Sequence, residues 1–367
     1  INIGAMFAPS AATAITNKFL AKAGLIYKAD IPALAHQFLD GTITADNTAK
    51  LQSLASMMPG DAANMPLDQF SAYYIEHLSS SYNMGFAIAC VSLIFSIAVY
   101  LFTRSWFKHA DVNAKQAAAQ GNAEVVELTP KQTKDRVVAL CLVFAVVIFF
   151  WMAFHQNGQS LTWFARDYTQ ATAVGWSRIG FNIWALALIA VSVYTLFSTF
   201  QSEKASGKLV SGAVTVVLWL GAFAIYRGLD NPLEIFPQLF QQFNPFFVVA
   251  LTPVSMAVFS ALAAKKSEKH PKGMEPSAPM KIALGMVVAA VGYFVMVLAS
   301  RGQASPAQLA GTVSPDPVVP LYLMGTYLVL TFAELLLSPM GISFVTKVAP
   351  PKYKGLMMGL WFAATAI

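Results

Sequence analysis

One acidic residue stands in the middle of an otherwise apolar stretch. Glu334 lies in FAELLLSPMG, within an apolar run over about 321–345. If that run is a helix, the carboxylate lies roughly 20 Å and 16 Å from its two ends, too far to reach either membrane surface. An ionisable group at such a depth usually faces a polar cavity, where a carboxylate can bind an ammonium group or carry a proton. The alternative is a structural glutamate that accepts hydrogen bonds from a neighbouring helix.

A second group of polar residues follows an apolar run in FFWMAFHQNGQSLTWFARDY, residues 149–168. A continuous helix would place Gln156 and Ser160 on one face and His155 and Gln159 on a neighbouring face. This pattern favours the outer half of a membrane span that lines a wet cavity. His155 can titrate near neutral pH, or it can be an ordinary hydrogen-bonding residue.

Two weaker signals lie in other apolar runs. FNPFFVVALTP, residues 243–253, places Asn244 beside a proline, a pattern that is common in transporter helices. Trp361 lies in the last apolar run, where an aromatic residue is usually part of the packing. The five histidines are scattered, and the motifs HExxH, CxxC and GxSxG do not occur. We therefore expect no metal site, no cofactor and no catalytic nucleophile.

The composition indicates an integral membrane protein. Of the 367 residues, 56% are hydrophobic and 11% are charged, whereas soluble domains average about 25% charged residues. Apolar runs of membrane-spanning length predict seven complete helices, at 84–103, 137–156, 181–200, 209–226, 244–264, 281–300 and 321–345. Partial spans are expected at 1–16 and 355–367, and because both ends of the chain are apolar we expect a fragment of a longer protein.

Lysine and arginine are distributed unequally between two sets of loops. Sixteen of the 24 lie in the loops 104–136, 201–208, 265–281 and 347–354. Cytoplasmic loops retain positive charge, so these four loops are predicted to be cytoplasmic. This placement explains the net charge of +6 without nucleic-acid binding.

Two segments between the apolar runs are soluble in character. The segment at about 25–81 falls on the outer side and contains helix-like pieces at 30–39, 46–58 and 67–78. It is interpreted as a solvated cap, with a binding module as the alternative. The segment 104–136 has mixed charge and much alanine and glutamine, which is typical of a partly helical linker.

Several motifs together resemble the proton-dependent oligopeptide transporters, a branch of the major facilitator superfamily. AELLLSPMGISFVTKVAPPKYKGLMMGLWFAATAI, residues 333–367, is similar to the tenth and eleventh helices of that family. FFWMAFHQNGQSLTWFA and FNPFFVVALTP resemble its seventh and eighth helices, and PSAPMKIALGMVV resembles the entry into the ninth. INIGA and YNMGFAIA resemble the end of the fifth-helix signature and the start of the sixth helix.

The resemblance implies an all-α membrane protein with the major facilitator fold, in which two six-helix bundles surround a central cavity. The end of the N-terminal bundle would occupy 1–103, the cytoplasmic linker 104–136 and the C-terminal bundle 137–367. The apolar pair at about 181–226 would be an extra helical hairpin that packs against lipid. We expect a monomeric, multi-pass protein of the bacterial inner membrane.

The resemblance also implies roles for individual residues. Glu334 matches the tenth-helix glutamate that holds the free amino terminus of a peptide. Asn2 and Asn244 match asparagines that engage peptide polar groups, and Trp361 matches an aromatic residue that shapes the side-chain pockets. Further candidates for substrate binding, taken from the matched motifs, are Gln156 and Ser338.

His155 departs from the family pattern, because an acid commonly precedes the glutamine at this point of the seventh helix. A gate salt bridge that uses this acid cannot form in the same way. His155 and Glu334 are therefore the candidates for proton coupling or gating.

The expected function is secondary active transport, namely proton-coupled symport of di- and tripeptides by alternating access. The partners are then peptides, protons and the lipid bilayer. A first alternative is transport of another small organic solute, with or without proton coupling. A remote alternative is a membrane-embedded enzyme or scaffold.

Overall fold

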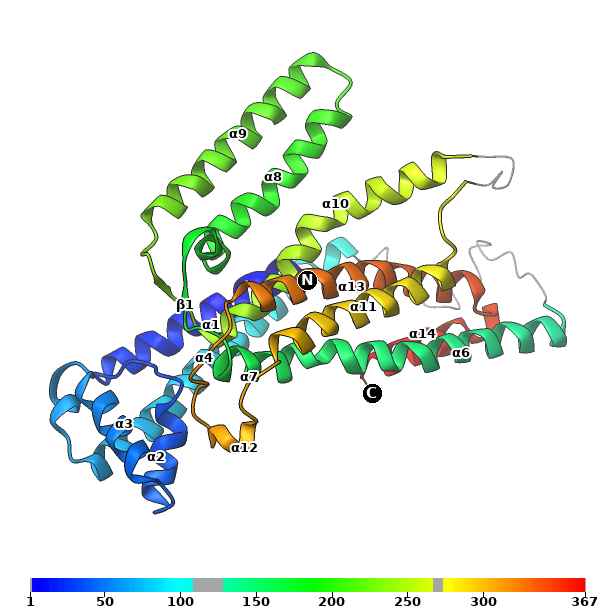
Figure 1. Cartoon of the computed structure of the whole chain (residues 1–367). Helices are drawn as coiled ribbons and strands as arrows, with labels where there is room; N and C mark the ends of the chain where they lie inside the picture. Colours follow the sequence, from blue (N-terminus) through cyan, green and yellow to red (C-terminus); the bar gives the residue numbers. More distant parts are fainter. Residues whose placement is uncertain (1, 108–127, 267–272, 367) are drawn as a thin grey trace.

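The protein is built almost entirely of helices, as the computed structural model in Figure 1 shows. The structure describes residues 2–107, 128–266 and 273–366, without the side chains of residues 338–340. Most of the predicted cytoplasmic linker, residues 108–127, lies outside the described residues.

The chain before the linker forms long helices with shorter ones between them. In order these are α1 (Asn2–Lys22), α2 (Ile31–Leu39), α3 (Ala45–Ser56), the 3₁₀ turn η1 (Gly60–Asn64), α4 (Leu67–Thr103) and the 3₁₀ turn η2 (Arg104–Phe107). Helices α2 and α3 lie where the sequence predicts short helices in the soluble segment. We call residues 25–81 the outer insert, after the side predicted from the loop charges.

The chain after the linker contains the remaining elements. In order these are α6 (Pro130–Phe154), η3 (His155–Gly158), α7 (Ser160–Asp167), β1 (Thr172–Ala173), η4 (Gly175–Phe181), α8 (Ile183–Gln201), α9 (Ala205–Gly228), β2 (Leu233–Glu234), η5 (Pro237–Gln242), α10 (Phe243–Ala264), α11 (Ala278–Ala299), α12 (Pro306–Leu309), α13 (Leu321–Val348), η6 (Pro351–Tyr353) and α14 (Lys354–Ala366).

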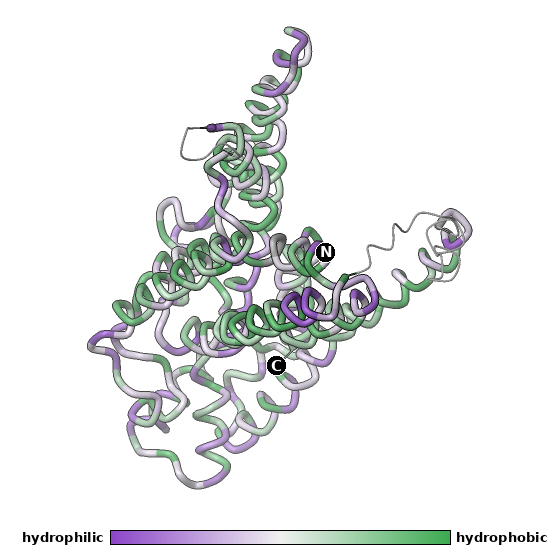
Figure 2. Tube along the Cα trace, turned by 90° about the vertical axis from the view of Figure 1, so that its right-hand side faces the viewer, coloured by the Kyte–Doolittle hydropathy of each residue, from purple (hydrophilic) through white to green (hydrophobic). Residues whose placement is uncertain are grey.

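Seven helical stretches in the described part of the chain are long and apolar enough to cross a membrane. They are Leu67–Trp106, Pro130–Asp167, Ile183–Gln201, Ala205–Gly228, Pro237–Ala264, Ala278–Ala299 and Leu321–Val348. Each coincides with one predicted span, so the predicted class, an all-α membrane protein with seven complete spans, is confirmed. Figure 2 shows hydrophobic residues along these helices and hydrophilic residues mainly near their ends and in loops.

Helix α4 differs from the prediction because it is continuous. The sequence pattern separates a short helix at 67–78 from a span at 84–103, whereas α4 runs without a break over both. No proline lies between them, and the hydroxyl of Ser81 donates to the carbonyl of His77 within the helix (2.7 Å). The outer insert is therefore joined rigidly to a membrane span.

A continuous helix through 149–168, on which the two predicted polar faces depend, does not form, because the helix is interrupted after Phe154. Helix α6 ends at Phe154, one 3₁₀ turn follows, and Gln159 has φ −120° and ψ −88° before α7 begins. Gly158 lies at the interruption, and glycine weakens a helix interior. The predicted pair Gln156 and Ser160 remains in contact, but the second predicted face is not continuous.

Close packing holds the long helices together where small residues allow it. A Cβ on Gly285 of α11 would lie 3.0 Å from the carbonyl oxygen of Ala333 on α13. A Cβ on Gly341 of α13 would lie 1.9 Å from the ring of Trp361 on α14. Both glycines therefore mark close approaches of α13, the kind of contact that stabilises helix pairs in lipid.

The inserted helix pair α8 and α9 is connected to the rest of the protein by adjacent segments. Strand β1 precedes the pair and β2 follows it, and the two strands are antiparallel. The guanidinium of Arg178 donates to the carbonyl oxygens of Leu229 (2.8 Å) and Asp230 (3.0 Å). The two ends of the α8–α9 pair therefore join the rest of the protein at one place. Near this place α8 packs against α1 and α10 (Figure 1).

Candidate functional site

A cavity of about 990 Å³ lies between the two parts of the chain. On one side are α1 and α4, with the start of the outer insert. On the other side are η3, η5, α10 and α13. The lining residues are Asn2, Ala5, Ala8, Pro9, Ala12, Thr13, Thr16, Asn17, Tyr27, Tyr82, Gly85, Phe86, His155, Asn157, Gly158, Phe236, Gln238, Gln241, Asn244, Pro245 and Tyr327.

The wall of this cavity carries amide, hydroxyl and aromatic groups but no lysine, arginine, aspartate or glutamate among the described residues. The predicted residues Asn2, Asn244 and His155 belong to it. They come from the beginning of α1, the beginning of α10 and the 3₁₀ turn η3 that follows α6. The fold thus brings together three candidates that are distant in the sequence.

Glu334 lies immediately behind Asn244. Its Oε2 atom accepts a hydrogen bond from Nδ2 of Asn244 (2.8 Å), although Glu334 itself is not part of the cavity wall. This bond also links α13 to α10, as the structural alternative for Glu334 expects. The carboxylate is half-buried, so its charge acts in an environment that screens it less than water does.

Thr331 completes the arrangement around the Asn244 amide. Nδ2 of Asn244 also donates to Oγ1 of Thr331 (3.1 Å), and the fully buried Thr331 hydroxyl donates to the carbonyl of Tyr327 (2.7 Å). An amide NH₂ group has two hydrogens, and both are used by α13. The Oδ1 atom of Asn244 is thereby left as the group that can accept a hydrogen bond from a ligand.

His155 is exposed at the cavity wall. Its ring lies 5.6 Å from the ring of Trp151, one helical turn earlier. The cavity wall presents no acidic side chain from the described residues to pair with it. A gate pair between His155 and a carboxylate is therefore not formed inside this cavity.

The other predicted residues lie elsewhere. The Gln156 amide donates to the carbonyl of Met152 (3.2 Å) and accepts from the Ser160 hydroxyl (2.6 Å), and it does not line the cavity. Trp361 is buried at 2% exposure, beside Gly341 and with its ring 6.1 Å from that of Phe144. Its place is in the packing of α14. The side chain of Ser338 lies outside the described residues.

Several polar residues of the site are absent from the sequence prediction. Tyr327 lines the cavity, and its hydroxyl donates to the carbonyl of Asn157 (3.2 Å). Tyr327, Thr331 and Glu334 follow one another at spacings of four and three, which places them on one helix face, so their pattern is a signal that the sequence contains. Gln241 donates to Thr162 (3.0 Å), and nothing in its local sequence distinguishes it.

Two oxygen atoms in the walls lack partners. Oγ1 of Thr13 and Oδ1 of Asn157 are buried, and neither has a hydrogen-bond partner in the described structure. Thr13 comes from α1 and Asn157 from η3, so they belong to the two sides of the cavity. Unpaired buried polar atoms are uncommon and are often found at functional sites.

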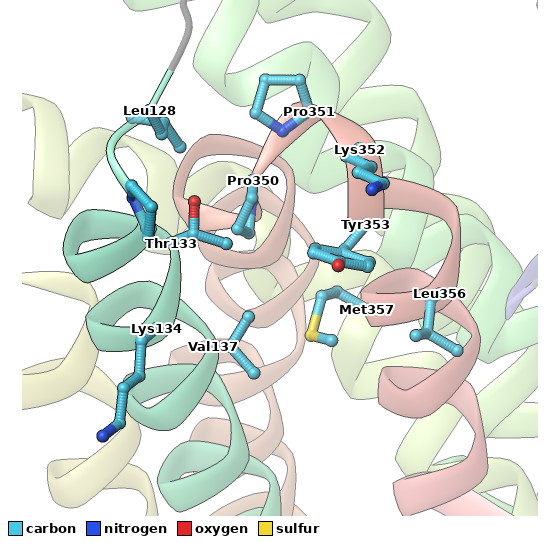
Figure 3. A pocket seen from close by; sticks show the side chains of 11 residues that line it. Leu128, Thr133, Lys134, Val137, Pro350, Pro351, Lys352, Tyr353, Leu356 and Met357 are labelled. Carbon is cyan, nitrogen blue, oxygen red and sulfur yellow. The ribbon is translucent and has the colours of Figure 1, made fainter.

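A second pocket, of about 680 Å³, lies at the beginning of α6 and beside η6 and α14. Figure 3 shows apolar residues such as Pro350, Met357 and Leu356 together with Lys134 and Lys352. None of the predicted site residues whose side chains the structure describes lines it. It is therefore separate from the candidate site.

Comparisons with known proteins give consistent results. The model of the POT family matches residues 215–367. A peptide transporter of Yersinia enterocolitica is 32% identical over 180 residues, which are 49% of this chain and 30% of that protein. A di-/tripeptide transporter of Lactococcus lactis subsp. cremoris is 22% identical over 299 residues, 77% of this chain and 54% of that protein. The chain thus spans about half the length or less of these relatives.

A solved structure of a peptide transporter POT in complex with sulfate aligns over 100% of this chain and 76% of its own, with 14% sequence identity and a TM-score of 0.39. The relatives named above are transporters, not enzymes. The POT family model matches residues 215–367, which are less than half of the chain, and the relatives named above are peptide transporters, so the comparisons show that the chain is similar to the POT family.

Proposed function

We propose that the protein is a proton-coupled symporter of di- and tripeptides in the bacterial inner membrane, that it works as a monomer and that access to its cavity alternates between the two sides. The observation that carries the proposal is the Asn244–Glu334 pair beside a cavity whose described wall contains no lysine, arginine, aspartate or glutamate. The names of the relatives support the choice of peptides as the substrate.

The pair fits the free amino terminus of a peptide. The carboxylate of Glu334, immediately behind the wall residue Asn244, offers a negative charge in partly dry surroundings, where charges interact more strongly than in water. The free Oδ1 of Asn244 offers a second acceptor for an ammonium N–H. Asn2, Thr13 and Asn157 supply polar groups for the rest of the peptide backbone.

The size and composition of the cavity also suit peptides. An extended dipeptide or tripeptide is at most about 7–11 Å long. The cavity of about 990 Å³ is large enough for it, and its apolar and aromatic lining accepts side chains of different kinds. The amide and hydroxyl groups of the wall then contact the peptide backbone, which is the same in all peptides.

Proton coupling is assigned to Glu334, with His155 as the second titratable candidate. An ionised carboxylate binds an ammonium group more strongly than a protonated one, so the protonation state of Glu334 and the binding of the peptide are linked. His155 lines the same cavity.

The test is uptake of labelled dialanine by the full-length protein in proteoliposomes. We expect an inward proton gradient to drive accumulation, Glu334→Gln to abolish it, and Glu203→Gln to leave it unchanged. Glu203 is the matched control because it is exposed between α8 and α9, away from the cavity. Absence of peptide uptake by the wild type, or full uptake by Glu334→Gln, would refute the assignment.

A second candidate is transport of another small organic solute without proton coupling. The absence of charged side chains from the described cavity wall, with His155 in place of the family's acid, favours it. Peptide uptake that is insensitive to the gradient would support uncoupled transport. Stronger competition by free amino acids than by dipeptides would support a different solute.

A further inference from the structure

Tyr27 of the outer insert forms part of the cavity wall. It lies between α1 and α2, outside the membrane spans, and it lines the cavity together with Tyr82 and Phe236. Its ring centroid lies 6.0 Å from that of Phe236. The insert is therefore not only a cap on the surface, because it contributes a side chain to the candidate site.

The backbone on both sides of Tyr27 is fixed by one residue. The hydroxyl of Tyr74 donates to the carbonyl of Ile26 (3.1 Å) and accepts from the amide of Lys28 (3.1 Å). Tyr74 is fully buried in the core of the insert. Tyr27 thus projects from a rigid support and not from a free loop.

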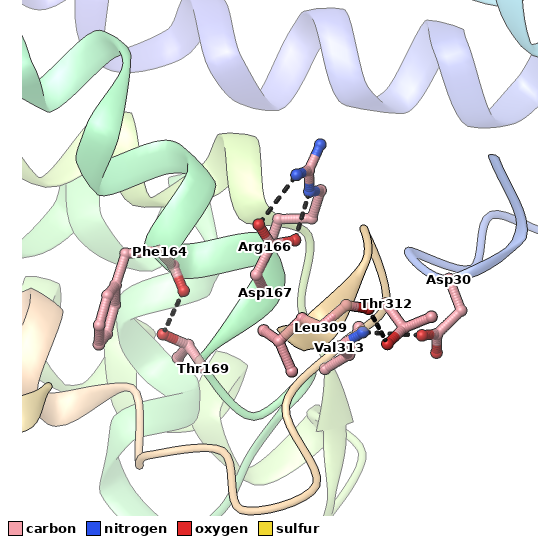
Figure 4. A network of polar contacts seen from close by, with 8 residues as sticks. All are labelled: Asp30, Phe164, Arg166, Asp167, Thr169, Leu309, Thr312 and Val313. Atoms are coloured by element: carbon pink, nitrogen blue, oxygen red, sulfur yellow. Dashed lines mark hydrogen bonds and ion pairs between the residues drawn. The ribbon is translucent and has the colours of Figure 1, made fainter. Parts of the chain in front are cut away.

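The insert is also attached to the other side of the cavity. Lys28 forms an ion pair with Glu234 of β2 (3.1 Å). Oδ1 of Asp30 accepts from the Val313 amide, shown in Figure 4, and from Lys50 of the insert, both at 2.8 Å. Each of these bonds holds the segment that carries Tyr27 in its place.

One more contact ties α2 to the loop after α12. The Gln37 side chain donates to the carbonyl of Ala310 (2.5 Å). This loop is itself bound to the end of α7, because the Ser314 amide donates to the carbonyl of Asp167 (2.7 Å). The insert and the chain after the linker therefore form one surface around the Tyr27 end of the cavity.

The position of Tyr27 matches the reach of a short peptide. The Ser10 hydroxyl on α1 donates to the Gln242 side chain (2.8 Å), and Gln242 lies two residues before Asn244 in the sequence. Asn17 is seven residues further along α1, about 10 Å away, and lines the cavity with Tyr27. A tripeptide spans at most about 11 Å, which is comparable with the rise of α1 from Ser10 to Asn17.

We propose that Tyr27 contacts the bound peptide and limits its length at the outer end of the cavity. This inference rests on the proposed peptide transport. The tyrosine ring occupies the space that a fourth residue requires. Burial and the neighbouring Tyr82 hydroxyl raise the pKa of Tyr27, so its hydroxyl is neutral at physiological pH and can form a hydrogen bond with the peptide.

The experiment measures inhibition of labelled dialanine uptake by di-, tri-, tetra- and penta-alanine. Tyr27→Ala is expected to improve inhibition by tetra-alanine relative to dialanine by roughly tenfold, because the ring no longer fills the space. Tyr27→Trp is expected to weaken inhibition by trialanine, and Tyr27→Phe to keep the wild-type length limit. Ile26→Ala is the matched control, because its side chain is exposed and lies outside the cavity.

The outcomes separate this inference from the proposed function. Suppose that the wild type takes up dialanine, and that Tyr27→Ala and Tyr27→Trp are inhibited by alanine peptides of each length as strongly as the wild type is. Tyr27 then does not contact the peptide. If Tyr27→Ala does not transport, the selectivity of Tyr27→Trp decides. If the wild type takes up no peptide, the proposed function fails, and with it the identification of the ligand at Tyr27.

Discussion

The two halves of helix α4 bury their residues in opposite ways. In the outer insert, Phe70 and Tyr74 are completely buried in a core of their own. In the membrane span of the same helix, Ile94 is 68% exposed and Phe102 is 85% exposed. Apolar residues gain from burial where the alternative is water, and they gain little where the alternative is a lipid tail. One continuous helix therefore follows two packing rules.

The same contrast applies to polar groups. Most charged side chains of the insert are exposed to solvent, whereas the side chains of Glu334, Thr331 and Asn244 meet between α10 and α13. A buried polar group in a membrane protein requires a partner, and these three residues satisfy one another. The geometry of the site thus follows from the packing of these polar residues between α10 and α13.

The largest expected effect comes from a large-to-small change in the insert. Phe70→Ala leaves a cavity in a dry core, and we expect it to destabilise the insert by about 3–5 kcal/mol. Phe95→Ala in the span is the matched control, because the Phe95 ring is 69% exposed and fills no core in the described structure. Thermal unfolding in lipid nanodiscs, followed by protease sensitivity of the insert, measures the difference. Equal losses for both variants would contradict two packing rules in one helix.

A smaller effect is expected from the buried hydroxyl behind the cavity. Thr331→Val removes an acceptor from the Asn244 amide, and an unpaired buried group costs about 1–3 kcal/mol. The amide then loses its fixed orientation, so we expect the KM for dialanine to rise roughly tenfold with little change in kcat. Thr331→Ser should restore the wild-type KM. A Val variant that loses kcat alone, or a Ser variant that does not recover, would show that Thr331 does not position Asn244.

Much of the fold is predictable from the sequence because membrane spans are encoded locally. The seven predicted spans coincide with helices, and the apolar pair 181–226 corresponds to α8 and α9. The interruption after Phe154 and the continuity of α4 were not predicted. In both places only a few residues determine whether the helix continues or ends. Local residues such as glycine and serine, together with tertiary contacts, decide between the two.

The candidate site is predictable in part. Glu334 can be identified from the sequence as a candidate site residue, because an ionisable side chain in an apolar span is energetically costly and usually functional. In the structure its hydrogen-bond partner is Asn244. Trp361 packs against Phe144 and does not line the cavity. Its apolar sequence context does not distinguish a tryptophan in helix packing from one in a binding pocket. Tyr27 could not be found, since only the folded insert brings it to the cavity wall.

The most direct test of the central claim compares dialanine with N-acetyl-dialanine as inhibitors of labelled dialanine uptake. If Glu334 and Asn244 bind an ammonium group, the wild type should prefer the free amine by roughly 10- to 100-fold, the equivalent of a charged hydrogen bond. Residual uptake or binding by Glu334→Gln should show a preference of only a few-fold. A wild type that does not distinguish the two peptides, or a variant that keeps the full preference, would contradict the claim.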